Sequence, residues 1–247
     1  MIKSTKIKSM RFKKRFGQNF LIDEDVVLSL VKAAKISPED VVLEVGAGTG
    51  VVTKELAKYA KKVIAIEIDR DLIPRLRESI KEFNNVEIIN SDILSFLENC
   101  KKNSTFKVVG SIPYQITSPL IHALIMLDTP PQSITLVVQY EVAEKICAKP
   151  PNATYLSNFI SLFGEAKIVQ KVKKQSFYPQ PSMESAIIHI KRKDKIPKQR
   201  EFKIWSGFLH RGFSHPRKML KFGARPTARA QELSLDSWIS IFNNETV

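Results

Sequence analysis

The amino-acid sequence predicts an α/β protein, with a parallel sheet covered by helices on both faces and a small helical C-terminal domain. Short, continuous apolar runs alternate with amphipathic segments through the first two thirds of the chain, as expected for strands buried on both faces. After about residue 197 the pattern becomes helical. A chain of 247 residues, 43% of them hydrophobic, can bury a core of this size.

Five strands are predicted in the α/β part, each followed by a turn or a helix. The predicted strands are 41–45, 63–67, 86–89, 107–110 and 134–139. Amphipathic segments between them lie near 51–60, 71–83, 118–127 and 141–148. Strands joined through helices pair in parallel, so these five form one covered sheet.

The alternation of strand and helix patterns stops in the last third of the chain. Two runs, 166–175 and 185–193, flank the Pro-rich loop "SFYPQPSMES" without a helix between them, which predicts an antiparallel edge hairpin. Aromatic and aliphatic residues then recur at helical spacing, at Phe202, Trp205, Phe208, Leu209 and Phe213, and no further strand is predicted. The expected organisation is a basic tail over 1–16, a Rossmann-like domain over 17–195 and a helical domain over 196–247.

The positive charge of the chain is concentrated in two segments. The formal net charge is +14, of which residues 1–16 carry +7 and residues 191–229 carry +11, leaving −4 for the remainder. Two separated basic runs favour a polyanion such as nucleic acid over a merely solvated face. The predicted RNA contacts are Lys13, Lys14, Arg15, Arg211, Arg217, Lys218 and Lys221.

Other compositional features narrow the class of protein. No apolar run reaches the roughly 18 residues of a membrane span and no secretory h-region follows the charged start, so we expect a cytoplasmic protein without membrane contact. Cys100 and Cys147 lie far apart without zinc-ligand spacing, so neither a disulfide nor a metal site is predicted.

A glycine-rich loop follows the first predicted strand. "VVLEV" runs into "GAGTG", which places Gly46, Gly48 and Gly50 where a backbone can approach a ligand closely. A dinucleotide fingerprint would read G-x-G-x-x-G, but Val51 occupies the place of its last glycine. Pyrophosphate binding is therefore disfavoured.

Two carboxylates follow the next two strands. Glu67 ends the second strand, nineteen residues after Gly48, where an acid accepts hydrogen bonds from ribose hydroxyls. Asp92 follows the third strand and is placed to accept from an adenine amino group. Singly, either residue could instead cap a helix or face solvent. Together with the glycine loop they predict a nucleoside pocket without a phosphate site, which suits S-adenosylmethionine better than NAD or ATP.

The fourth strand ends in Ser111-Ile112-Pro113-Tyr114. This tetrapeptide resembles the (Asn/Asp/Ser)-x-Pro-(Tyr/Phe) signature of methyltransferases that act on exocyclic amines. The Ser111 oxygen and the Ile112 carbonyl would accept the two amine hydrogens, which favours a pyramidal nitrogen with its lone pair free to react. Pro113 stiffens the turn, and Tyr114 offers a stacking face worth roughly 1–3 kcal/mol to an extruded base. On its own the stretch could also be an ordinary loop turn.

Seven motifs along the chain resemble, in order, those of the small-subunit ribosomal RNA adenine N6-dimethyltransferase family. They are "KRFGQNFLID", "VLEVGAGTGVVT", "VIAIEIDRDL", "GSIPYQITSPLI", "VVQYEVAEKICAKP", "FYPQPSMESAII" and "GFSHPRKML". The resemblance implies a Rossmann-like class I methyltransferase fold with a small C-terminal helical domain. It also implies dimethylation, by S-adenosylmethionine, of two adjacent adenines in the 3′-terminal hairpin of small-subunit rRNA, during assembly of the immature small subunit. We expect the protein to be a monomer.

The resemblance also implies individual roles at the site. Asn19 and Leu21 would close over the cofactor and Gly46 would contact its methionine part. Glu67 and Asp92 would take the ribose and the adenine. Ser111 would serve both cofactor and amine, and Phe177 would flank the target base opposite Tyr114.

The sequence departs from the family pattern at four positions near the site. The family pattern reads Asn-Leu-Pro-Tyr-Asn where this chain has Ser111-Ile112-Pro113-Tyr114-Gln115, and Met183 stands where Val is usual. The helical domain is also shortened near "KMLKFGARPTARAQELS". Three other functions remain open: a large-subunit rRNA adenine methyltransferase that confers macrolide resistance, an assembly factor with weak or no catalysis, and, more distantly, a nicotinamide dehydrogenase.

Overall fold

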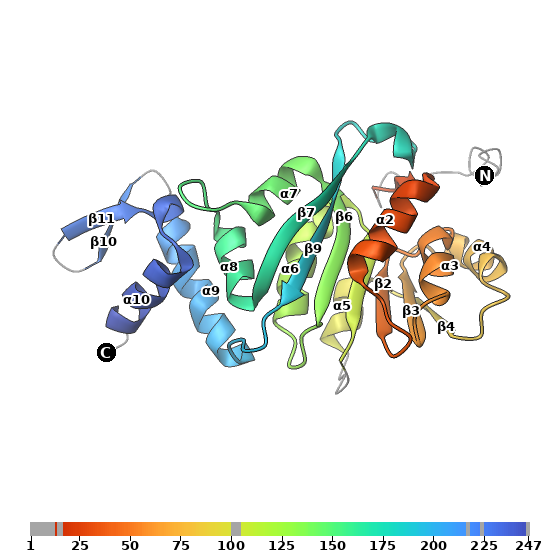
Figure 1. Cartoon of the computed structure of the whole chain (residues 1–247), viewed down its shortest axis with the longest axis horizontal. Helices are drawn as coiled ribbons and strands as arrows, with labels where there is room; N and C mark the ends of the chain where they lie inside the picture. Colours follow the sequence, from red (N-terminus) through yellow and green to blue (C-terminus); the bar gives the residue numbers. More distant parts are fainter. Residues whose placement is uncertain (1–12, 14–16, 100–104, 216–217, 223–224, 246–247) are drawn as a thin grey trace. The chain divides into compact units, whose positions relative to one another are not determined.

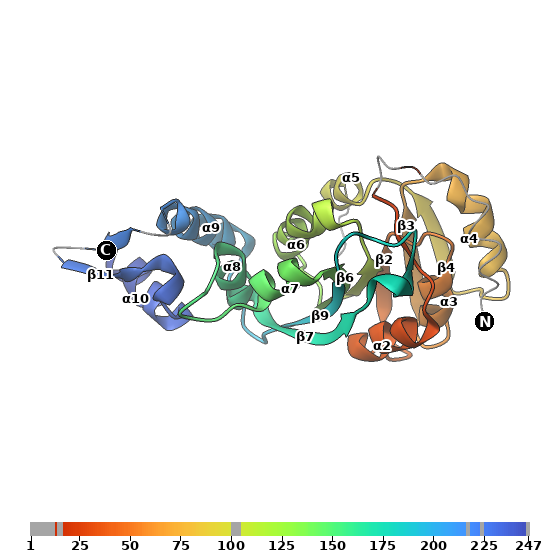
Figure 2. The ribbon, with the colours of Figure 1, turned by 90° about the horizontal axis from the view of Figure 1, so that it is seen from above.

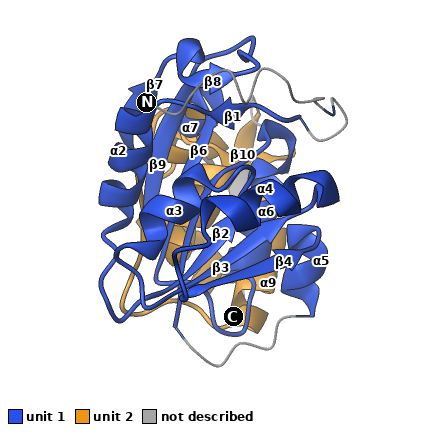
Figure 3. Ribbon diagram, turned by 90° about the vertical axis from the view of Figure 1, so that its right-hand side faces the viewer, with its two compact units in different colours: residues 1–143, 168–190 blue, residues 144–167, 191–247 orange. Residues whose placement is uncertain are grey.

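The computed structural model describes residues 13, 17–99, 105–215, 218–222 and 225–245. The chain divides into two compact units, coloured separately in Figure 3. One comprises residues 1–143 and 168–190, the other 144–167 and 191–247. The predicted domain boundary between residues 195 and 196 stays a prediction.

Seven strands form the main sheet, in the order β4-β3-β2-β5-β6-β9-β7. Their bounds are β2 Val41–Val45, β3 Lys62–Glu67, β4 Val86–Asn90, β5 Lys107–Ser111, β6 Ser133–Gln139, β7 Gly164–Val172 and β9 Ser185–Arg192. The first five run parallel, with β2 between β3 and β5. The five predicted strands are confirmed to within one residue at either end, and β7 and β9 are neighbours at the sheet edge, as predicted.

Helices cover both faces of the parallel strands. Figure 2 shows α2 and α3 on one face and α5 and α6 on the other. From Glu24 to Cys147 the α-helices are α2 Glu24–Ala34, α3 Val51–Ala57, α4 Ile73–Ser79, α5 Ile93–Glu98, α6 Thr117–Ile125 and α7 Tyr140–Cys147 (Figure 1). This arrangement confirms the predicted Rossmann-like architecture.

Helix α2 was not predicted, although its sequence explains it. The Asp23 side chain caps its start by accepting from the backbone N–H groups of Asp25 and Val26. Leu30 and Ala34 are fully buried on its inner face, and Lys35 ends it in the left-handed region at φ 49°.

The second compact unit is built on aromatic packing. Its helices are α8 Tyr155–Phe163, α9 Gln199–Phe213 and α10 Leu235–Glu245. The predicted spacing on α9 is confirmed, because Phe202 and Phe208 are 1% and 3% exposed. Phe208 meets Trp238 edge to face with ring centroids 5.6 Å apart, and Trp205 stacks on Phe242 at 4.1 Å.

The prediction that no strand follows residue 197 is wrong. Strands β10 Met219–Phe222 and β11 Arg225–Arg229 pair as an antiparallel hairpin. Pro226 lies within β11, and a proline in a short charged run argues against a strand in the sequence. A two-stranded ribbon tolerates it, because each strand has a free edge that needs no N–H donor.

Candidate active site

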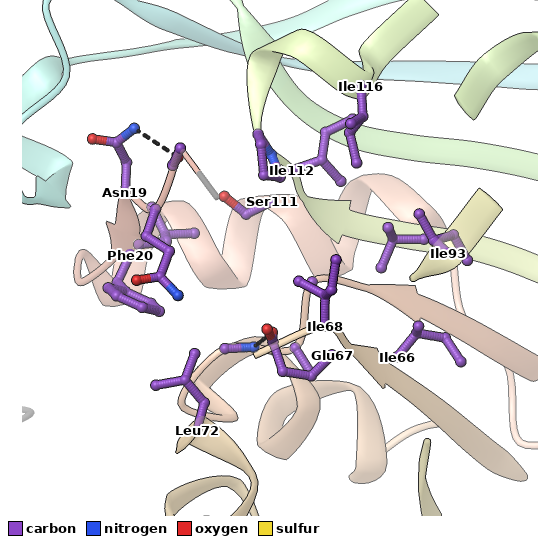
Figure 4. A pocket seen from close by; sticks show the side chains of 18 of the residues that line it. Asn19, Phe20, Ile66, Glu67, Ile68, Leu72, Ile93, Ser111, Ile112 and Ile116 are labelled. Carbon is purple, nitrogen blue, oxygen red and sulfur yellow. Dashed lines mark hydrogen bonds between the residues drawn. The ribbon is translucent and has the colours of Figure 1, made fainter. Parts of the chain in front are cut away.

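A cavity of about 240 Å³ opens at the carboxyl ends of β2, β3, β4 and β5. Chain order reverses between β2 and β5, because β3 and β4 lie on one side of β2 and β5 and β6 on the other. Parallel sheets bind ligands at such a switch point, where the loops leaving neighbouring strands diverge. Residues from all four strand ends line the cavity, as does the segment Gly17–Leu21 (Figure 4).

The glycine loop lies at the end of β2, as predicted. Gly46 and Gly48 have φ values of +74° and +58°, in the left-handed region that side chains rarely adopt, and both line the cavity. A Cβ on Gly48 would lie 3.2 Å from Cδ1 of Phe20. The loop therefore brings bare backbone to the cavity wall.

Glu67, at the end of β3, is buried and held by backbone. Its Oε2 accepts from Gly48 N–H at 2.7 Å and its Oε1 from Asp69 N–H at 2.8 Å. Burial raises the pKa of this carboxyl, and the two N–H groups offset only part of the effect. The carboxyl is thus fixed beside the glycine loop, and Figure 4 shows Glu67 at the cavity wall.

Asp92 both caps a helix and lines the cavity. It caps α5, because its Oδ1 accepts from Ser95 N–H at 3.0 Å, so the capping alternative raised by the sequence is correct for that oxygen. The residue also lines the cavity, at the end of β4.

The Ser111–Tyr114 stretch forms the third side of the cavity. Ser111 is the last residue of β5, and Ile112 behind it is 4% exposed. The Tyr114 hydroxyl lies 2.7 Å from Ser185 Oγ. Burial raises the pKa of that phenol more than this hydrogen bond lowers it. A short 3₁₀ turn, Tyr114–Ile116, follows Pro113 and leads into α6. The turn holds the Tyr114 backbone, and the contact with Ser185 holds its hydroxyl.

A two-residue ladder brings two distant segments to the same cavity. Strand β1, Phe20–Leu21, pairs antiparallel with β8, Phe177–Tyr178, and Leu21 faces Phe177 across the ladder. Both of those residues are buried and both line the cavity. Asn19, just before the ladder, donates from Nδ2 to the Gly17 carbonyl at 3.2 Å. The structure thus gathers the cofactor and target-base candidates of the sequence around one cavity.

Some lining residues were not singled out from the sequence. Phe20 packs under Gly48, and Gln18 and Ser91 also line the cavity. Phe20 and Gln18 belong to the "GQNFL" motif, which was the available signal, but nothing in the sequence distinguished Ser91.

The predicted RNA contacts fall into three groups. Arg211 on α9 and Lys218 just before β10 are exposed. Lys13 instead pairs with Asp69 and Asp71. Lys14, Arg15 and Arg217 lie outside the described residues, as does the side chain of Lys221 on β10.

Neither a metal cluster nor a membrane-spanning helix is found among the described residues. They contain no cluster of three or more His, Cys, Asp or Glu side chains able to hold a metal ion. Within the same residues, no helix combines the length and the apolarity that crossing a membrane requires.

Comparisons with known proteins agree with this site. The model of the family "Ribosomal RNA adenine dimethylase" matches residues 9–243. A ribosomal RNA small subunit methyltransferase A of Caldanaerobacter subterraneus is 37% identical over 95% of this chain and 97% of its own length. One from Clostridium botulinum is 39% identical over 85% of this chain and 78% of its own.

Solved structures show the same fold. The 23S rRNA methyltransferase ErmE has a TM-score of 0.76 at 27% identity, covering 93% of this chain and all of its own. A dimethyladenosine transferase from Plasmodium falciparum has a TM-score of 0.73 at 32% identity, covering 81% of this chain and 73% of its own. With a family model spanning nearly the whole sequence and the motif residues gathered at one cavity, this chain belongs to the ribosomal RNA adenine dimethylase family.

Proposed function

We propose that this protein dimethylates the N6 amines of two adjacent adenines in the 3′-terminal hairpin of small-subunit rRNA. One observation carries the proposal: the glycine loop, Glu67 and Asp92 share a single cavity with the Ser111–Tyr114 strand end. A nucleoside pocket and an amine-binding turn therefore open into the same space. The family uses S-adenosylmethionine as its methyl donor.

The residues at the cavity fit that cofactor. Among the described residues that line it, none is Lys or Arg, so the cavity offers no cationic side chain to a pyrophosphate. Glu67 and Asp92 supply carboxylates at the ends of neighbouring strands β3 and β4, as ribose hydroxyls and an adenine amine require. Gly46 and Gly48 leave room for close backbone approach.

The side chains position the amine rather than transfer its proton. The cofactor, when bound, supplies an electrophilic methyl group on a sulfonium. Ser111 Oγ and the Ile112 carbonyl accept amine hydrogens, while Tyr114 and Phe177 hold the base between aromatic faces. The methylated nitrogen loses its proton to water, so no general base is needed. Proximity and orientation then supply most of the acceleration.

The alternatives raised by the sequence are not favoured. The relatives from Caldanaerobacter subterraneus, Clostridium botulinum and Listeria welshimeri, at 36–39% identity, are named small-subunit methyltransferases, whereas the large-subunit enzyme ErmE is 27% identical. The catalytic turn and the cofactor cavity occur together, which an inactive assembly factor does not require. An immature small subunit as the partner, a monomeric state and a cytoplasmic location stay predictions.

Single-turnover transfer to undermethylated small subunits tests the proposed function. We expect labelled methyl groups on two adjacent adenines of the 3′-terminal hairpin, mapped by mass spectrometry. Methylation of large-subunit rRNA instead, or binding to the small subunit without transfer, would contradict it.

Replacing Glu67 by glutamine is expected to weaken cofactor binding. The amide group cannot accept on its nitrogen, so a ribose hydroxyl or Gly48 N–H loses a charged acceptor, at a net cost of roughly 1.5–3 kcal/mol. Calorimetric titration with S-adenosylhomocysteine measures this loss. Glu87→Gln, on the exposed part of β4, is the matched control. Equal affinity in both variants would remove Glu67 from the ribose site.

Neutralising Arg217, Lys218 and Lys221 to glutamine is expected to flatten the salt dependence of RNA binding. Each phosphate contact contributes about 0.7–0.9 to the slope of log affinity against log salt. Cofactor affinity should stay at the wild-type value. The control carries Lys61→Gln and Lys81→Gln, two lysines exposed on the other compact unit. A slope that the triple variant leaves unchanged would mean that these residues serve only solubility.

A further inference from the structure

Lys13 closes a ring of hydrogen bonds at one edge of the cofactor cavity. Its backbone N–H donates to Gln18 Oε1 at 2.9 Å, and its ammonium group lies 2.5 Å from Asp69 Oδ1. Gln18 Nε2 donates to the other oxygen, Asp69 Oδ2, at 2.7 Å. Lys13, Gln18 and Asp69 therefore form a closed ring. The backbone and the ammonium group of Lys13 are both hydrogen-bonded in it, as are the oxygen and the nitrogen of the Gln18 amide.

The carboxylate at the centre of this ring needs the lysine. Asp69 is 3% exposed, and burial alone would raise its pKa. The hydrogen bonds from Lys13 and Gln18 outweigh burial and lower that pKa, and the same carboxylate raises the pKa of Lys13. Asp71, which is mostly exposed, gives the ammonium a second partner at 2.6 Å.

The ring connects two walls of the cavity. Gln18 lies in the lining segment Gly17–Leu21, whose far end is held by the β1–β8 ladder. Asp69 donates its backbone N–H to Glu67, the carboxylate at the end of β3. Among the described residues, Lys13 is thus the cation that fastens the near end of this segment to the Glu67 side of the cavity.

Removal of the lysine charge would act on both walls. Asp69 and Glu67 are buried carboxyls two residues apart, and the charge on Asp69 already raises the pKa of Glu67. Without the charged donor Lys13, Asp69 would either stay ionised with the neutral donors Gln18 Nε2 and Asp71 N–H, or take up a proton. Either change loosens Gln18 and alters the charge that faces a cofactor ribose.

We infer that Lys13 is a positioning residue for the cofactor site rather than an RNA contact, acting through Asp69 and Gln18 on the segment Gly17–Leu21. The inference rests on the proposed function only in taking S-adenosylmethionine as the ligand of the cavity. Lys13 thus has a different role from Lys14 and Arg15, although the charge pattern of the sequence predicted all three as RNA contacts.

The test compares Lys13→Met, Lys13→Arg and Lys14→Met. Methionine keeps much of the apolar stem and removes the charge, arginine restores the cation, and the Lys14 variant is the matched control for the basic tail. We expect Lys13→Met to weaken binding of S-adenosylhomocysteine by about fivefold to tenfold, in the range of couplings exerted by residues outside a ligand's direct contacts. Lys13→Arg should recover most of the affinity, and Lys14→Met should bind like the wild type.

Two further measurements distinguish this role from the alternatives. If Lys13 acts through Gln18, the double variant with Gln18→Met should bind no more weakly than Gln18→Met alone. The salt slope of RNA binding should be the same for Lys13→Met and the wild type. Wild-type cofactor affinity in Lys13→Met, or a flattened RNA slope in it, would overturn the inference. No cofactor binding by any protein, wild type included, would instead contradict the proposed function.

Discussion

Ser111→Ala is expected to slow methyl transfer on the order of a hundredfold, because loss of the Oγ acceptor misplaces the amine that Ser111 and Ile112 hold together. Cofactor affinity should fall less than the rate, and RNA affinity should not change, since the acceptor is engaged chiefly as the nitrogen becomes pyramidal. The measurement is single-turnover transfer to undermethylated small subunits. Ser118→Ala, an exposed serine on α6, is the matched control.

Ser111→Asn is the complementary change at the same strand end. The serine oxygen lies about one bond length nearer the backbone than an asparagine carbonyl would, and a misplacement of about 1 Å can cost about a hundredfold in rate. Asparagine should therefore equal or exceed the wild type, most visibly for the second methyl, when one amine hydrogen remains to be oriented. Mono- and dimethyladenosine are separated by mass spectrometry. Equal rates with serine, alanine and asparagine would show that the side chain at position 111 does not orient the amine.

Glu44→Gln is expected to stabilise the fold at pH 8 and to leave it unchanged near pH 4. Glu44 lies in β2, is 1% exposed, and its Oε2 has no hydrogen-bond partner. Burial raises the pKa of Glu44 to about 8, and the Glu67 charge adds to the effect, while the nearby polar groups of Thr53 oppose it in part. The folded state therefore holds a proton that the unfolded chain releases above about pH 4.5.

The direction of the pH effect follows from this difference. Between about pH 4.5 and 8 the folded state binds more protons than the unfolded state, so the free energy of unfolding falls as pH rises. A shift from 4.5 to about 8 limits the loss to about 5 kcal/mol, and relaxation around the ionised group makes about 2–3 kcal/mol the expected size. Urea unfolding from pH 4 to 8 measures it. Glu82→Gln, on an exposed side chain, should run parallel to the wild type. The same behaviour for Glu44→Gln would mean that Glu44 is ionised in the folded protein.

The strands of the parallel sheet could be predicted because burial on both faces leaves a plain signal. β2 is the example, since "VVLEV" is apolar except at Glu44 and four of its five residues are buried. The β10–β11 hairpin carries no such signal, because neither its length nor its composition differs from a loop. Helix α2 was missed although its Asp23 cap and apolar face were both present in the sequence.

The site was predictable where function depends on which residue ends a strand. Glu67, Asp92 and Ser111 could be placed because parallel strands bring their carboxyl ends to one edge. The position of Lys13 could not be predicted in this way. Its partners Asp69 and Asp71 lie more than fifty residues away in the sequence, and charge counting alone assigned it to the basic tail.

Under the proposed function, we expect the β1–β8 ladder to link the binding of the two substrates. It has only two residue pairs, and a ribbon this short gains little stability from its own hydrogen bonds. In the proposed roles, Leu21 on one strand contacts the cofactor and Phe177 on the other contacts the target base. The ladder is already paired in the structure, so a ligand that holds one strand also steadies the other, and the second ligand then meets a site that needs less ordering. Thermodynamic reciprocity requires that the cofactor tighten RNA binding by the same factor by which RNA tightens cofactor binding. Occupancy of both halves, rather than affinity for either alone, then sets how often the enzyme is competent to react.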